Sequence, residues 1–323
     1  MKRRSLLAVL IAAAIGGSVS HAQAQNFTKP VRIIVPFAAG GTSDILARLI
    51  GPKLQEAIGQ PVVVENKTGG GGNIAADFVA KADKDGHTLL LSDLSTIATA
   101  PSLYANMTYS PTKDLTPVGM ILFAPYVLAV TPSLSAKSIA ELVAEAKANP
   151  GKLLFANAGL GFANHIGGVQ LEKGWGVQFK HVPYRGGADA IKGVLSGESQ
   201  LILNGVTATA SFVTQGQLRG LAVSGDIKAP QLPDVPTFKE LGLNPVDMGT
   251  WQGILTTGGT PAPTVARLNT ELNKILAMPE IAQRIASLGG QAKPGSAAEL
   301  GSWMEKNAAN FAVIIKEVGI KPQ

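Results

Sequence analysis

Residues suited to holding an anion stand where the chain passes from a strand into a helix. A short apolar strand leads through Gly40 and Gly41 into Thr42-Ser43-Asp44, after which apolar residues recur at helical spacing. One of these three polar residues is expected to cap the helix. The first N–H groups of a helix lack partners, the helix dipole adds partial positive charge, and glycines let a ligand approach the backbone. The pattern predicts a carboxylate or phosphate site, with a purely structural turn as the alternative.

Polar or glycine-rich segments also follow the other expected strands. They are Ser92 to Thr96, Ala158 to His165, Tyr184 with Arg185, and Asn204 to Thr207. Because the carboxyl ends of parallel strands face the same crevice, these segments are candidate ligand contacts. The guanidinium of Arg185 suits bidentate binding of a carboxylate, and a solvent-facing ion pair fits it equally well. His165 stands at a helix start, where it either contacts an anion or has a structural role.

Motifs for catalysis, metal binding and nucleotide binding are missing from the sequence. There is no G-x-S-x-G or H-E-x-x-H segment, and the three histidines beyond residue 24 lack metal-ligand spacing. The G-x-G at Gly159 and Gly161 lacks the third glycine of a dinucleotide motif, and the Gly69–Gly72 run lacks the lysine of a phosphate-binding loop. We therefore expect no catalytic residue, no metal and no cofactor. An exported hydrolase with another arrangement is the enzyme alternative.

The N-terminus has the pattern of an export signal. Lys2, Arg3 and Arg4 precede a short apolar run, and Ala22-Gln23-Ala24 supplies a small-residue motif, so we expect cleavage after Ala24. An uncleaved anchor needs roughly 20 apolar residues, more than this run supplies. Cleavage lowers the formal net charge from +6 to +3, because the segment carries three cations and no carboxylate. With no cluster of Lys or Arg, the sequence favours a periplasmic protein without a nucleic-acid partner.

The pattern of strands and helices predicts an α/β protein with two units. Apolar runs and helical segments alternate over most of the chain, which implies right-handed crossovers and a parallel sheet. Capping boxes at Ser138, Thr237 and Ser296 mark helix starts, and the chain beyond Pro263 is expected to be helical. The sequence contains no cysteine, so the exported fold does without disulfides.

Several segments together resemble one protein family. They are KPVRIIVPFAAGGTSDILAR, VVVENKTGGGGNIAAD, YSPTKDLTPV, NAGLGFANH, VPYRGG and LPDVPTFKELG. In this order the chain resembles the tripartite tricarboxylate transporter substrate-binding proteins, also called the TctC family or Bug receptors, over nearly all of its length after the signal. The match is specific to the family and much less specific to the ligand.

The resemblance implies a two-lobed periplasmic solute-binding fold of type II, with the ligand cleft between the lobes. The first lobe would comprise residues 25–125 and 225–323, and the second would comprise residues 126–224. A hinge is expected at residues 124–126 and 224–226. Such a receptor closes over a small carboxylated metabolite and hands it to a two-component membrane permease. The receptor itself is expected to be a monomer, and a sensor that signals through a membrane kinase is the rival binding function.

In this family a ligand carboxylate is pinched between one glycine-rich loop of each lobe, partly through ordered waters. The resemblance assigns to the first loop Phe37, Ala38, Ala39, Gly40, Gly41, Thr42, Ser43 and Asp44, and to the second Ala158, Gly159, Leu160, Gly161, Phe162 and Ala163, with His165 beyond it. Both loops are expected to offer unpaired N–H groups.

Two departures from the family pattern leave the ligand open. Asn204 stands where relatives usually carry aspartate, and SDLSTIA, from Ser92 to Ala98, replaces a segment with glycine and histidine. Both are expected near the distal half of the ligand. A dicarboxylate, an aromatic acid, an amino acid and a pyridine carboxylate all fit, and one or two carboxylates are favoured over citrate.

Overall fold

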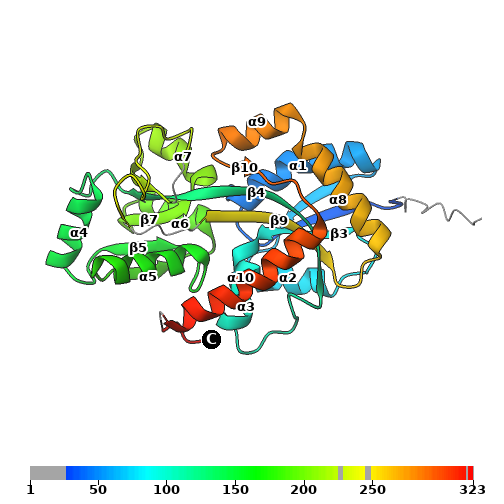
Figure 1. Ribbon diagram of the computed structural model, residues 1–323, viewed down its shortest axis with the longest axis horizontal. Coiled ribbons are helices and arrows are strands. Elements are labelled where there is room, and N and C mark those ends of the chain that lie inside the picture. Colours follow the sequence, from blue (N-terminus) through cyan, green and yellow to red (C-terminus); the bar gives the residue numbers. More distant parts are fainter. Residues whose placement is uncertain (1–26, 225–227, 244–248, 318, 323) are drawn as a thin grey trace, which may run out of the picture.

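The computed structural model describes residues 27–224, 228–243, 249–317 and 319–322, and for Ser95 and Thr96 it describes the backbone only. The expected export signal and part of the second hinge lie outside the described residues. The described chain forms two halves that Figure 1 shows side by side, with the green elements in one and the blue, cyan and orange elements in the other. Among the described helices, none has both the length and the hydropathy to cross a membrane.

The sheet of the first half contains parallel and antiparallel pairs. Strand β1 (Val31–Val35) lies between β2 (Val62–Asn66) and β3 (Thr88–Asp93), parallel to both. Strand β9 (Gly249–Thr257) pairs antiparallel with β3 and with β4 (Leu115–Val130). The expectation of a parallel sheet is therefore wrong for β4 and β9, which enter this half by connections other than a βαβ crossover.

Helices cover both faces of this sheet. Helices α1 (Thr42–Ile58) and α8 (Ala262–Leu276) pack on the face that carries Ile33, while α2 (Asn73–Ala80) and α3 (Leu94–Leu103) pack on the face that carries Ile34. Because β1 is buried on both faces, its sequence is an apolar run instead of an alternating one. A short 3₁₀ turn at Gly70–Gly72 precedes α2. Helix α3 was not predicted, since its first residues resembled only a polar strand end.

The second half repeats the strand and helix alternation. Strand β5 is parallel to β6 and β7, and β8 lies on the far side of β4. The strands are β5 (Leu154–Asn157), β6 (Lys180–Pro183), β7 (Leu201–Gly205) and β8 (Arg219–Val223). The helices are α4 (Ile139–Ala148), α5 (Ala163–Trp175), α6 (Gly187–Leu195) and α7 (Val206–Thr214). The capping box of α4 is confirmed, since the Glu141 N–H donates to the Ser138 hydroxyl over 3.2 Å.

Strand β4 connects the two halves. Its residues up to Pro125 pair with β9, and from Tyr126 onward they pair with β7, with β8 on the other side. The change of partner at Pro125 and Tyr126 coincides with the first expected hinge position. Sequence analysis predicted only the part beyond Tyr126 as a strand, because prolines and a glycine interrupt the earlier part.

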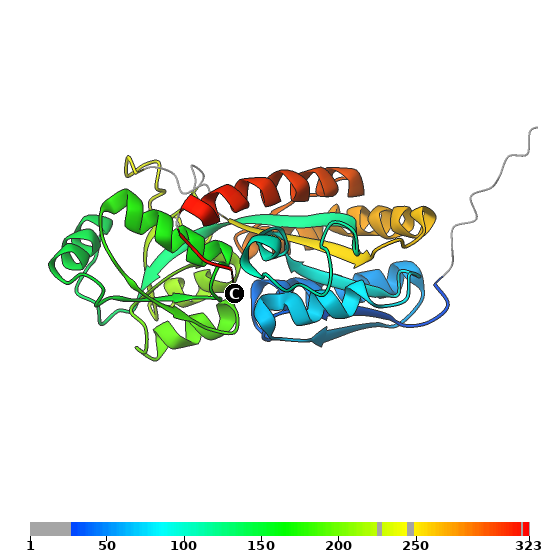
Figure 2. The ribbon, with the colours of Figure 1, turned by 90° about the horizontal axis from the view of Figure 1, so that it is seen from below.

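The C-terminal helix also contacts both halves. After α9 (Pro279–Ser287) and the short strand β10 (Gln291–Ala292), helix α10 (Ala297–Glu317) begins at the predicted capping box, where the Glu299 N–H donates to the Ser296 hydroxyl over 3.1 Å. Figure 2 shows α10, in red, running along one side of the molecule from the first half to the second. Leu300 and Met304 join a core of the first half, whereas Ile315 joins the main core of the second half.

Candidate functional site

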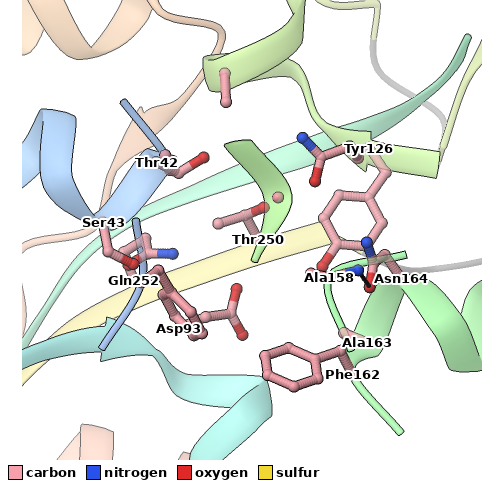
Figure 3. Close-up of a pocket in the computed structure, with 15 residues that line it drawn as sticks. Thr42, Ser43, Asp93, Tyr126, Ala158, Phe162, Ala163, Asn164, Thr250 and Gln252 are labelled. Atoms are coloured by element: carbon pink, nitrogen blue, oxygen red, sulfur yellow. Dashed lines mark hydrogen bonds between the residues drawn. The ribbon is translucent and has the colours of Figure 1, made fainter. Parts of the chain in front are cut away.

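An inner cavity of about 60 Å³ lies where the two halves meet. Its lining consists of Phe37, Gly41, Thr42, Ser43, Asp93, Tyr126, Ala158, Phe162, Ala163, Asn164, Gly187, Asn204, Ala208, Thr250 and Gln252. Figure 3 shows that side chains from α1, β3, β4, β9 and the second half surround the same space. The cavity is thus built by both halves, as the cleft of a closing receptor requires.

Four helices begin around this cavity. They are α1, α5, α6 and α7, and each contributes residues of its first turn or its N-cap to the lining. No capping side chain bonds the first turn of any of these helices; their N-cap residues are Gly41, Phe162, Gly186 and Gly205. Glycine and phenylalanine have no side-chain acceptor, so the expectation that Thr42, Ser43 or Asp44 caps α1 is wrong. Uncapped N–H groups and four converging helix dipoles favour an anion in the cavity.

The first loop is held in shape by Asp44. Gly40 has φ +85°, a conformation that favours glycine, and its N–H donates to Asp44 Oδ2 over 3.0 Å. Asp44 also accepts hydrogen bonds from Arg48 and Asn66. Burial alone would raise the pKa of Asp44, but the bonds from Arg48, Gly40 and Asn66 lower it below its usual range. The Gly40 N–H is therefore occupied, and the loop residues that line the cavity are Phe37, Gly41, Thr42 and Ser43.

A hydrogen bond from Ser43 joins helix α1 to strand β9. The Ser43 hydroxyl donates to Gln252 Oε1 over 2.8 Å, and both residues are buried. Gln252 lies on β9 opposite Asp93 of β3. The bond fixes the first turn of α1 against the sheet, and Gln252 itself lines the cavity.

The second loop is braced from behind by its own helix. The Gly159 N–H donates to Asn157 Oδ1 over 3.1 Å, the Ala158 N–H to Asn164 Oδ1 over 3.3 Å, and the Gly161 N–H to His165 Nδ1 over 2.8 Å. The expectation that this loop offers unpaired N–H groups is wrong for these three residues, because nearby side chains already accept from them. The free donors on this side belong to the start of α5.

Asn164 offers one such donor. Its residue is 3% exposed, its Oδ1 is taken by Ala158, and its Nδ2 has no partner. Figure 3 shows Asn164 beside Tyr126 on the cavity wall, with the bond to Ala158 drawn as a dashed line. A buried amide N–H without an acceptor costs free energy, so this site is completed by a ligand or water that accepts.

His165 supports the loop from outside the cavity. Its ring meets the ring of His181 edge-on at 4.6 Å, and His181 Nε2 lies 3.1 Å from Glu172 Oε2. Burial, with a further effect from His181, lowers the pKa of His165 to about 4, although Glu172 acts in the opposite direction. The neutral ring keeps Nδ1 available as the acceptor for Gly161. The sequence left open whether His165 contacts an anion or has a structural role, and its contacts in the structure give it the structural role.

An outer cavity of about 340 Å³ adjoins the inner one. Phe37, Ala158 and Phe162 line both, and the rings of Phe37 and Phe162 meet edge to face with their centroids 5.8 Å apart. Tyr184 and Arg185, both predicted site residues, line only the outer cavity. The Tyr184 hydroxyl bonds Ser199 at 3.0 Å, and Arg185 is exposed.

The other predicted site residues whose side chains are described do not line the inner cavity. Ala39 and Gly40 are exposed, whereas Ser92 and Thr207 are buried and Gly161 packs close to Leu103. Asp44 and His165 act on the loops as described above. Thr96 belongs to α3, and its side chain lies outside the described part of the chain. The structure thus brings together eight of the predicted residues: Phe37, Gly41, Thr42, Ser43, Ala158, Phe162, Ala163 and Asn204.

Several residues of the inner cavity were missed by sequence analysis. They are Tyr126, Gly187, Ala208, Thr250 and Gln252, whereas Asp93 and Asn164 stood within candidate segments without being singled out. Burial and the charge of Asp93 raise the pKa of Tyr126 well above its usual value, although a bond with Thr250 acts against this, so the phenol stays neutral. Gln252, an amide side chain between Trp251 and the run Gly253-Ile254-Leu255, was the available signal in the sequence.

Comparison with known proteins identifies the family. The family model for "Tripartite tricarboxylate transporter family receptor" (TctC) matches residues 46–320. The chain belongs to the TctC receptor family. It is also 35% identical, over 314 residues, to the UPF0065 protein in the tcbD-tcbE intergenic region of Pseudomonas sp. (strain P51), which covers 96% of this chain and 93% of that relative.

Solved structures of TctC-like receptors share the fold. The periplasmic binding protein BugD is 34% identical with a TM-score of 0.87, and the match covers 92% of this chain and 100% of BugD. Rpa4515 of R. palustris, solved with adipate, is 32% identical with a TM-score of 0.88, covering 92% and 99%. The chain therefore has the two-lobed α/β fold of the periplasmic solute-binding proteins, as the sequence resemblance implied.

Proposed function

We propose that this TctC receptor captures a small carboxylate in the inner cavity and delivers it to a two-component membrane permease. The observation that carries the proposal is Asn164, whose buried Nδ2 lacks an acceptor at a cavity where four uncapped helices begin. The adipate bound to the related Rpa4515 supports a carboxylic acid as the ligand. After removal of the N-terminal signal at Ala24, the receptor acts in the periplasm as a monomer.

The carboxylate is held from both sides of the cleft. One oxygen accepts from the first-turn N–H groups of α1 and the Thr42 hydroxyl, and the other accepts from Asn164 Nδ2 and the first turn of α5. One helix dipole adds only about 0.3–1 kcal/mol, so the charge-assisted hydrogen bonds in a dry cleft supply most of the affinity. Waters share in these contacts where the cavity is wider than the carboxylate.

Closure of two lobes couples the halves of the site. The first lobe comprises residues 25–125 and 225–323, and the second comprises residues 126–224, with α10 packed along both. Because the ligand touches α1 in one lobe and α5 in the other, it favours the closed population over the open one. The expected hinge at Pro125 and Tyr126 lies where β4 changes its partner from β9 to β7.

The receptor binds its ligand without converting it. Within the described lining of the inner cavity Asp93 is the one side chain that could act as a base, and the Ser43 hydroxyl donates its hydrogen bond to the neutral amide of Gln252 instead. A hydrolase needs a base beside its nucleophile, and an amide oxygen does not remove a proton from serine.

A thermal-shift screen tests the carboxylate function. The protein from Gln25 onward is heated with mono-, di- and aromatic carboxylic acids and with the corresponding amides. An acid at about 100 times its dissociation constant stabilises the fold by roughly 2.7 kcal/mol, which raises Tm by several degrees. A shift with an acid and none with its amide supports the proposal. Equal shifts with acid and amide, or conversion of the acid seen by mass spectrometry, contradict it.

A further inference from the structure

Asp93 gives the inner cavity a negative charge that a carboxylate receptor does not need. It ends β3 and lies opposite Gln252 of β9. Among the described residues that line the cavity it is the one acidic side chain, and no basic side chain lines it. Figure 3 shows the Asp93 carboxylate facing the space bordered by Tyr126 and Phe162.

Aromatic rings surround the same part of the cavity. Phe37, Tyr126 and Phe162 line it, and the edge-to-face contact of the two phenylalanines closes it toward the outer cavity. The charge of Asp93 contributes to the raised pKa of the Tyr126 phenol, which places the two groups within electrostatic reach. Ring faces attract cations, and a carboxylate beside them adds a full opposite charge. Together these groups suit an ammonium.

Other groups of the same lining suit a carboxylate. They are the donors at the start of α1, whose acidic residue Asp44 does not line the cavity, and the unpartnered Nδ2 of Asn164. A ligand with acidic groups alone would therefore bring negative charge close to Asp93 in a confined space. A ligand that carries an ammonium as well would satisfy both the donor groups and Asp93.

We infer that the ligand of this receptor is a small zwitterion, with its carboxylate at the start of α1 and at Asn164 and its ammonium between Asp93 and the aromatic rings. The inference rests on the proposed function and narrows its substrate class. A structural alternative is that Asp93 serves only as the N-cap of α3, which begins at Leu94.

Matched acids that differ in one group test the ligand class. Isothermal titration uses three sets of acids, and within a set the members carry an ammonium, a hydroxyl or a hydrogen at the same position. The sets are L-alanine, L-lactate and propionate; L-aspartate, L-malate and succinate; and 4-aminobutyrate, 4-hydroxybutyrate and butyrate. The ammonium member of the set that binds should bind about 10- to 100-fold more tightly than its partners, the range expected for a hydrogen bond to a charged group. Equal or tighter binding of the hydroxyl or hydrogen member overturns the inference while leaving the carboxylate receptor standing. Binding of no acid by folded protein overturns both.

The variant Asp93→Asn separates ligand recognition from helix capping. Asparagine caps helices about as well as aspartate, so the substitution removes the charge and keeps the cap. We expect the preference for the ammonium member to fall to about one or to reverse, with Tm of the free protein little changed. Asp83→Asn, which removes an exposed charge far from the cavity, is the matched control and should keep the preference. An unchanged preference in Asp93→Asn overturns the inference.

Discussion

The rings of Phe37 and Phe162 meet edge to face across the cleft, with centroids 5.8 Å apart and an interplanar angle of 65°. Phe37 follows β1 of the first half, and Phe162 precedes α5 of the second half. Because both rings line the inner and the outer cavity, their contact separates the two. We therefore predict that a ligand passing between the two cavities needs this contact to open.

Truncation of Phe162 should accelerate ligand release. Phe162→Ala removes the ring between the cavities, so water reaches the carboxylate site and the closed state loses an aromatic contact. We expect about 10- to 100-fold weaker binding, mostly through a faster dissociation rate in stopped-flow measurements. Phe162→Leu keeps an apolar side chain there, so its dissociation rate should lie between the rates of wild type and Phe162→Ala. A dissociation rate that is the same in all three proteins would show that the rings do not close the cavity.

A side chain at Gly41 should block the cleft without unfolding the protein. Gly41 has φ −78° and ψ 167°, an extended conformation that valine adopts, and a Cβ there would lie 3.4 Å from Ala38 O and 3.9 Å from Ala188 Cβ in the other half. In Gly41→Val the methyl groups would fill the space between the lobes. We expect at least about a hundredfold loss of affinity by calorimetry, near-normal circular dichroism, and a smaller loss for Gly41→Ala. Normal affinity of the valine variant would remove this turn from the site.

Stability should fall in mild acid because His165 is held neutral. Its pKa is lowered to about 4 from an ordinary value of 6.5, so the unfolded chain binds the extra proton first. The stability from this group is complete above pH 6.5 and is lost as pH falls toward 4, by about 2 kcal/mol at pH 5. Urea unfolding of wild type and His165→Gln between pH 7.5 and 5 measures it. The glutamine variant, which keeps an acceptor for Gly161, should show a flatter profile; parallel profiles would contradict the assignment.

The end of α10 should stabilise the second half. Ile315 is 3% exposed within its main core, whereas Val313 on the same helix is 57% exposed. Ile315→Ala leaves a cavity and is expected to lower the free energy of unfolding by about 2–4 kcal/mol, against less than about 0.5 kcal/mol for Val313→Ala. Denaturant unfolding compares the two. Equal effects of the two substitutions would mean that the helix end does not pack there in solution.

Much of the first loop and of the fold was predictable from local sequence. A strand, a glycine-rich turn and a helix start encode Gly41, Thr42 and Ser43 within a few residues, and the same pattern located Ala158 and Phe162. The conformation of such segments is set by consecutive residues, because a glycine turn and an uncapped helix start each depend only on residues close together in the chain.

The other wall of the site depends on contacts between distant segments. The antiparallel pairing of β4 and β9 brings Tyr126, Thr250 and Gln252 to the cavity. Most of β4 could not be recognised as a strand in the sequence, because prolines and a glycine interrupt it. The sequence placed Asn164 in a loop motif. That its Nδ2 has no partner is known only from the structure, where its Oδ1 accepts from the Ala158 N–H. Neither feature has a local signature in the sequence.

The most direct test of a carboxylate held by Asn164 is calorimetry on Asn164→Asp. The substitution keeps the acceptor for the Ala158 N–H and replaces the free donor with an oxygen that repels a carboxylate. The account predicts at least about a hundredfold loss of affinity for the acid identified in the screen, with no loss in Asn310→Asp, an exposed control. Affinity within about threefold of wild type in folded Asn164→Asp would contradict the central claim.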